Sequence, residues 1–146
     1  MMKRNNLFPG AEISVDHFFS NPLGRLFNTY GKEKADAKCK GGCIFVDTAS
    51  GMTHVEMQSS LNSHHTLAAK ESFEEMCSSV GVVPQNYLSD NGSSFRNTEF
   101  EAHLKQFHQT IHHSAVGAHH SNGIAERHIA KVMSIARAML HHQAIH

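Results

Sequence analysis

Three acidic residues, Asp16, Asp90 and Glu126, occupy positions from which they could act together in one reaction. Asp16 ends one apolar, strand-like run, and Asp90 ends another and is followed by an Asn-Gly pair. Because open α/β sheets gather their functional groups at the carboxyl ends of strands, we expect both aspartates at one edge of a sheet. Glu126 lies about 100° round from Ala125, a member of the apolar stripe of the last expected helix, so its side chain can reach over that edge.

Two of these residues also have a structural explanation. Asp90 and the Asn-Gly pair could form an Asx-type turn, and Glu126 could be a first-turn glutamate that the helix dipole favours. Asp47 ends another apolar run and competes with Asp16 for a place in the site. With Asp16 on the first and central strand, Asp47 falls at the end of the neighbouring strand, where it can cap the turn Thr48–Gly51. We therefore assign Asp16 to chemistry and Asp47 to structure.

A cluster of three carboxylates implies a particular chemistry. Like charges repel, so an all-oxygen site of this kind is normally neutralised by hard divalent cations such as Mg²⁺ or Mn²⁺. Two such ions about 3.5–4 Å apart can activate an attacking oxygen and stabilise the leaving oxygen at a phosphodiester. The pattern therefore predicts metal-dependent phosphoryl transfer.

The elements that must position these residues follow from apolar periodicity and turn residues. We expect strands over 12–19, 43–47, 52–57, 86–89 and 109–113, and helices over 63–80, 97–107 and 122–142. This order predicts an α/β fold with a five-stranded mixed sheet, in which an antiparallel meander is followed by crossover connections. We expect one domain over 12–146, an N-terminal tail over 1–11, and a long exposed connection between strands over 17–42, where Pro, Gly and charged residues gather.

Composition narrows the possible functions without naming one. The chain has 13 Lys and Arg against 13 Asp and Glu, so its net charge points to no polyanionic partner. No window approaches the roughly 18 consecutive apolar residues of a membrane-spanning helix, and the start lacks a signal-peptide run. Three cysteines fit a reducing compartment. The 14 histidines include four His-His pairs, but Cys or carboxylate partners at zinc-ligand spacing are missing, so we expect no zinc site.

Several motifs resemble the catalytic core of retroviral and retrotransposon integrases, most closely the Copia type, over about residues 9–142. The matching segments are Ile13–Asp16, Ile44–Gly51, Ser89–Phe95 and Gly117–Arg127. Thirty-five residues separate Asp90 from Glu126, as they do in that family. This spacing together with both flanking motifs is far more specific than any single segment.

The resemblance implies a ribonuclease H-like fold with flanking helices, truncated at its C-terminus, and a two-metal DDE site of Asp16, Asp90 and Glu126 with Mg²⁺ or Mn²⁺. Such enzymes trim a DNA end with water and then use the freed 3′-hydroxyl to attack target DNA. The implied partners are the DNA ends of a mobile element and target DNA, and the implied working form is a homo-oligomer. The implied location is the nucleus, otherwise the cytoplasm, without membrane association.

The resemblance also suggests contacts with nucleic acid near the glutamate. Asn122 and Gly123 match the family's loop-to-helix junction, and Arg127, Lys131 and Arg137 supply positive charge for phosphates on the last helix. The family's zinc module and C-terminal DNA-binding module are not encoded in these residues, so we expect a core only. Two alternatives stay open, namely an inactive truncated relic that binds nucleic acid or protein, and a ribonuclease H-like nuclease.

Overall fold

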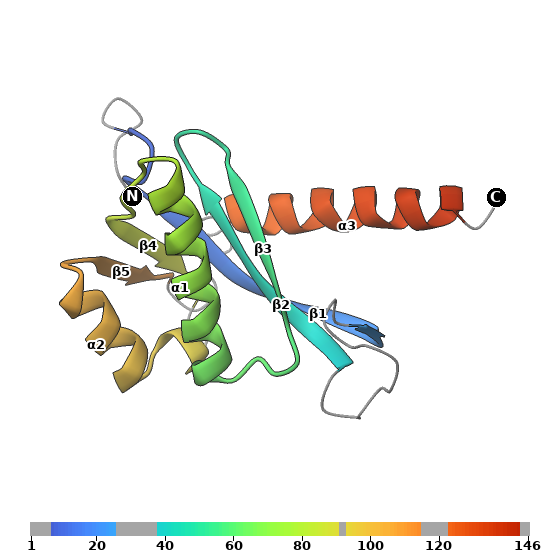
Figure 1. The fold of residues 1–146 in the computed structure, drawn as a ribbon, viewed down its shortest axis with the longest axis horizontal. Coiled ribbons are helices and arrows are strands. Elements are labelled where there is room, and N and C mark those ends of the chain that lie inside the picture. The colour runs from blue at the N-terminus through green and yellow to red at the C-terminus, as the bar shows by residue number, and fades with distance from the viewer. Residues whose placement is uncertain (1–6, 26–37, 91–92, 115–122, 144–146) are drawn as a thin grey trace.

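The structure, a computed structural model, describes residues 7–25, 38–90, 93–114 and 123–143. For residues 20–25, 38, 93, 124, 137 and 140–143 it describes the backbone alone. The elements in chain order are β1 (Ile13–Arg25), β2 (Lys38–Asp47), β3 (Thr53–Gln58), α1 (Ser63–Ser79), β4 (Asn86–Ser89), a 3₁₀ turn (Ser93–Phe95), α2 (Thr98–Gln106), β5 (Thr110–His113) and α3 (Gly123–Gln143). The expected order of strands and helices is confirmed (Figure 1).

The five strands form one sheet in the order β3-β2-β1-β4-β5. β2 runs antiparallel to both β1 and β3, whereas β4 runs parallel to both β1 and β5. A parallel neighbour requires a crossover connection, and α1 and α2 supply the two that β4 and β5 need. The mixed sheet with β1 at its centre is therefore confirmed.

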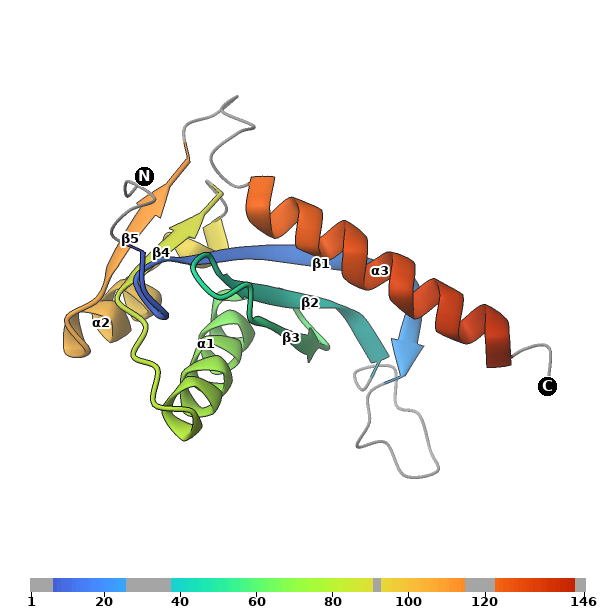
Figure 2. The same cartoon turned by 90° about the horizontal axis from the view of Figure 1, so that it is seen from above.

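The helices cover the two faces of the sheet unequally. α1 and α2 lie on one face, and α3 crosses the other face along β1 and β2 (Figure 2). The main core lies between the sheet and α1, where the ring of Phe45 on β2 stacks on Phe73 of α1 with centroids 4.6 Å apart. Ile13 and Val15 of β1 belong to this core. Since side chains alternate along a strand, Asp16 faces the opposite layer, the one that holds α3.

Two helices begin at asparagine caps. The side chain of Asn62 accepts the backbone N–H of His65 at 2.9 Å, and that of Asn97 accepts the N–H of Phe100 at 2.9 Å. Caps of this kind satisfy backbone donors that a helix start leaves unpaired. None of the described helices combines the length and the apolarity that crossing a bilayer requires.

The extent predicted for the long connection, residues 17–42, is wrong. β1 continues to Arg25 and pairs with β2, which already begins at Lys38, so that only 26–37 separate the two strands. The pairing register shifts between Phe19 and Gly24, and this irregularity accommodates the Asn-Pro pair that suggested a loop. The expected tail over 1–11 also ends earlier, because Gly10 and Ala11 are buried.

Candidate active site

Parallel pairing brings Asp16 and Asp90 to the same edge of the sheet. β1 and β4 pair in the register Ile13 with Tyr87 and Val15 with Ser89. Asp16 and Asp90 are the next residue on each strand segment, so both follow the last paired position. Asp16 is half-buried, and Asp90 is exposed.

Glu126 comes to this edge on α3. The helix starts at Gly123, and the neighbouring Ala125 is fully buried where α3 packs against β1 and β2. Glu126 is exposed and lies in the first turn, one residue round the helix from that buried contact. An acidic residue in a first turn also interacts favourably with the helix dipole.

The charges of the three carboxylates act on one another. The pKa of Asp16 is raised from 3.8 to about 6, chiefly by burial and next by the negative charge of Asp90. The N–H of His17 opposes this shift by donating to Asp16 Oδ1 at 2.8 Å, and Glu126 adds a smaller contribution that again raises the pKa. Asp90 and Glu126 therefore lie within electrostatic range of Asp16 from two different elements.

The donor set has the chemistry that a hard divalent cation prefers, because all three groups are carboxylates and their repulsion is what a cation would relieve. The side chains are not, however, arranged around a common point. In the described part of the chain, no three His, Cys, Asp or Glu side chains gather closely enough to hold one metal ion. The three carboxylates thus interact electrostatically, but their side chains do not form a complete set of ligands around one point.

Asp47 has the structural role expected from the sequence. It is fully buried, its Oδ2 accepts the Ser50 hydroxyl at 2.6 Å, and its Oδ1 accepts the N–H of Ala49 at 3.3 Å. Asp47 pairs with Ile13, a core residue, and directly opposite residues share a face of the sheet. Asp47 therefore lies on the other face from Asp16, and its capping of the turn is confirmed.

Sequence reasoning missed a histidine that supports Asp90. The buried Ser89 hydroxyl donates its hydrogen to the carbonyl of Asp90 at 2.8 Å. Because that hydrogen is used, the Ser89 hydroxyl oxygen accepts from Nδ1 of His113, also at 2.8 Å. His113 stands opposite Ser89 in the pairing of β4 with β5. The cross-strand position of His113 depends on sheet register, so no local motif in the sequence indicated it.

The residues expected to contact nucleic acid are only partly described. Asn122 lies outside the described residues, as does the side chain of Arg137. Arg127 and Lys131 are exposed four residues apart on α3, and Arg127 Nε donates to the carbonyl of Gly123 at 3.1 Å. Residues four apart share one face of a helix, so these two cations form a small basic strip beside Glu126.

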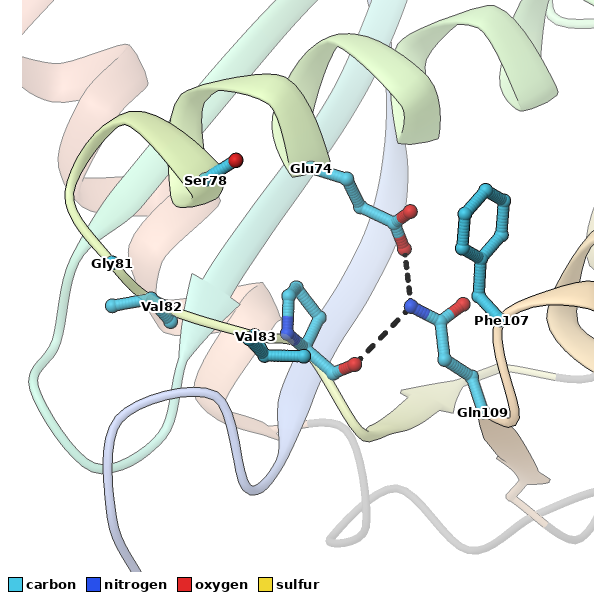
Figure 3. A pocket seen from close by; sticks show the side chains of 8 residues that line it. Glu74, Ser78, Gly81, Val82, Val83, Phe107 and Gln109 are labelled. Carbon is cyan, nitrogen blue, oxygen red and sulfur yellow. Dashed lines mark hydrogen bonds between the residues drawn. The ribbon is translucent and has the colours of Figure 1, made fainter.

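A pocket of about 360 Å³ lies on the α1 and α2 side of the sheet (Figure 3), and none of the three carboxylates lines it. Glu74 of α1 and Gln109 point toward each other on its wall, joined by a hydrogen bond of 2.7 Å. Behind them the fully buried Lys70 donates from Nζ to Glu74 Oε1 at 2.7 Å and to Gln109 Oε1 at 2.8 Å. The pocket thus sits over a buried polar network and is separate from the candidate site.

The raised pKa of Asp16 predicts that Asp16→Asn stabilises the metal-free protein at pH 7. Between about pH 4 and pH 6 the folded state binds more protons at Asp16 than the unfolded state, so the wild-type free energy of unfolding falls as pH rises through this window. A shift of this size, discounted for partial exposure, corresponds to about 1–2 kcal/mol. Urea unfolding in the presence of chelator should show the two proteins converging near pH 4 and the variant more stable at pH 7. Parallel pH profiles would contradict the assignment.

The fold of this chain is similar to that of several solved integrase structures. The HTLV-2 integrase catalytic core domain in complex with magnesium, in its dimeric form, is 22% identical with a TM-score of 0.65, over 92% of this chain and 74% of that chain. The simian T-cell lymphotropic virus intasome in complex with PP2A regulatory subunit B56 gamma is 18% identical with a TM-score of 0.65, over 86% and 39%. The BIV integrase catalytic core domain is 15% identical with a TM-score of 0.56, over 81% and 63%.

No family model and no curated protein matches the sequence. Similarity at these identities speaks to the fold, and one fold can support many functions. The five-stranded mixed sheet with helices on both faces is a ribonuclease H-like fold, similar to that of retroviral integrase catalytic cores.

Proposed function

We propose that this chain is the catalytic core of a DNA-integrating enzyme that carries out metal-dependent polynucleotidyl transfer, namely 3′-end processing and strand transfer. One observation carries the proposal. Asp16 lies within β1, Asp90 directly follows β4 and Glu126 is in the first turn of α3, yet Asp90 and Glu126 both raise the pKa of Asp16. Acidic groups within electrostatic range of one another are costly to the fold, and a cation-dependent reaction would explain why they are there.

The residues of the chain have distinct parts in this reaction. Asp16, Asp90 and Glu126 would hold Mg²⁺ or Mn²⁺, and the HTLV-2 integrase core structure in complex with magnesium supports that choice of ion. When bound, the cations supply Lewis acidity at the phosphodiester and lower the pKa of an attacking water or hydroxyl. Arg127 and Lys131 would bind DNA phosphates beside the site; this part of the proposal is supported by their exposure on α3 near Glu126.

The expected source and partners belong to the same proposal. A retrotransposon integrase of the Copia type would act in the nucleus on element ends and target DNA. Two ends must be joined together, so a homo-oligomer is the expected working form. The dimeric and trimeric forms of the HTLV-2 integrase core support oligomerisation as a property of this fold.

A non-catalytic role is the second candidate, and one observation favours it. Within the described residues no three potential ligands are close enough together to hold a metal ion. A relic that kept the fold but lost a closed ligand set would bind nucleic acid or protein without catalysis.

The test supplies the purified chain with Mn²⁺ or Mg²⁺ and a pre-nicked branched DNA that mimics a joining product. We expect weak strand joining or its reversal, because imperfect positioning of two DNA ends alone can cost about 100-fold. Chelation of the metal should abolish the reaction, and Mn²⁺ binding should be detectable by electron paramagnetic resonance. Cleavage of an RNA–DNA hybrid without joining would instead indicate a nuclease. A folded protein that neither binds Mn²⁺ nor acts on DNA would favour the non-catalytic role.

A further inference from the structure

His17 directly follows Asp16 on β1, and its side chain points to the opposite face of the sheet. Its half-buried ring stacks on Phe95, with centroids 4.6 Å apart and planes inclined by 20°. Its Nε2 lies 2.9 Å from the hydroxyl oxygen of Thr66, near the start of α1. The side chain of His17 is therefore held at two points outside its own strand.

Phe95 is itself firmly supported. It is fully buried in the 3₁₀ turn that follows β4, and its ring packs edge-on against Phe100 of α2 at 5.8 Å. The neighbouring Ser94 hydroxyl donates to the carbonyl of Leu61 at 2.8 Å. Phe95 thus gives His17 a rigid surface within the segment that comes after Asp90.

The backbone of His17 acts on Asp16 directly. Its N–H donates to Asp16 Oδ1 at 2.8 Å, which fixes one oxygen of the carboxylate. The pairing of β1 with β4 ends at Val15 and Ser89, one residue before each aspartate. Beyond that point the stack of His17 on Phe95 ties the two chain segments together on the face away from the carboxylates.

We propose that His17 is a positioning residue, which holds Asp16 in place relative to Asp90 through its stack on Phe95 and its backbone hydrogen bond. The proposal rests on the proposed function and deepens it. The ring of His17 lies on the far face of the sheet and touches no reacting group, so its effect passes through Asp16. Replacing a residue that orients a metal ligand typically costs about 10–100-fold in metal affinity or activity.

The experiment compares His17→Ala with His54→Ala, a matched control. His54 is also a half-buried strand histidine; its ring lies 6.3 Å from that of Phe45 and 5.9 Å from that of Phe73, and its Nε2 is 2.9 Å from Glu56. We expect His17→Ala to weaken Mn²⁺ binding about tenfold or more, measured by electron paramagnetic resonance titration. His54→Ala should leave Mn²⁺ affinity near the wild-type value even where its loss of thermal stability is similar.

A conservative variant separates the stack from the side-chain hydrogen bond. His17→Phe keeps an aromatic ring against Phe95 and the backbone N–H to Asp16, and loses only the bond to Thr66. Its Mn²⁺ affinity should stay within about threefold of wild type, the scale of one ordinary hydrogen bond. Amide hydrogen exchange at Phe95 in the metal-free protein should rise in His17→Ala and stay low in His17→Phe.

Equal weakening of Mn²⁺ binding in the two alanine variants would overturn the positioning role, because the effect would then be general destabilisation. Unchanged hydrogen exchange at Phe95 in His17→Ala would also contradict it. A wild-type protein that binds Mn²⁺ without joining DNA would contradict the proposed reaction, while the binding comparison would still decide the role of His17. A wild-type protein that binds no Mn²⁺ would overturn both.

Discussion

Glu126→Gln is expected to abolish DNA joining, with a loss of at least about 100-fold, since metal-assisted stabilisation of charge is worth several kcal/mol. The amide keeps the size of the side chain and loses the charge that attracts the cation. Glu126 is exposed in the first turn of α3, so the substitution removes no core contact and at most a few tenths of a kcal/mol of helix-dipole interaction. The rate of joining on branched DNA and the affinity for Mn²⁺ should fall together.

Glu101→Gln is the matched control for this substitution. Glu101 is likewise exposed and lies in the first turn of a helix, α2, on the other side of the sheet. It should retain wild-type joining and wild-type Mn²⁺ affinity. Equal joining by the wild type and by Glu126→Gln would mean either that a contaminating enzyme produced the signal or that the carboxylate site is wrongly assigned.

The positions of the three carboxylates could be predicted because each depends on a short-range pattern. Apolar runs end at Asp16 and Asp90, and the stripe that includes Ala125 fixes which side of the last helix faces the sheet. The choice between Asp16 and Asp47 followed from strand order alone, and the register of β1 with β2 places Asp47 opposite Ile13, on the other face of the sheet from Asp16. Their catalytic role remains a prediction.

The features that sequence reasoning missed all depend on long-range pairing. β1 continues through a stretch rich in turn residues because β2 offers it a partner and an irregular register absorbs the extra residues. Gly41, opposite Phe19, permits this close pairing, since a Cβ there would lie 2.0 Å from the Phe18 carbonyl oxygen. His17 could be assigned to the far face by strand alternation, but its partner Phe95 comes from a turn 78 positions later.

Lys70 is the least predictable of the buried residues. In the sequence it looks like an ordinary solvated lysine on a helix, yet its side chain is 0% exposed. Besides Glu74 on its own helix, it reaches Nδ1 of His103 at 2.7 Å and Oε1 of Gln109 at 2.8 Å. Lysine can only donate, so Nδ1 of His103 must accept and that imidazole must be neutral. Burial and the charge of Lys70 accordingly lower the pKa of His103.

Lys70→Met is expected to lower the free energy of unfolding by about 3–5 kcal/mol, the range for removing one partner of a buried ion pair. The variant leaves Glu74 as an uncompensated, mostly buried charge, although Tyr87 still donates to Glu74 Oε1. It also removes the donor that Gln109 Oε1 accepts in the wild type. This loss is a large share of the roughly 5–15 kcal/mol that stabilises a typical domain, so urea unfolding is best measured at low temperature.

The origin of the loss can be isolated with a second substitution. Adding Glu74→Gln to Lys70→Met removes the orphaned charge and keeps an acceptor for the hydroxyl of Tyr87, so the double variant should be more stable than Lys70→Met alone. Lys105→Met, at an exposed position of α2, should change the free energy of unfolding by no more than about 0.5 kcal/mol. A cost at Lys70 no larger than at Lys105 would show that the buried network joining α1 to Gln109 contributes nothing to the fold. A double variant less stable than Lys70→Met would show that the hydrogen bonds of Glu74, and not its uncompensated charge, determine the loss.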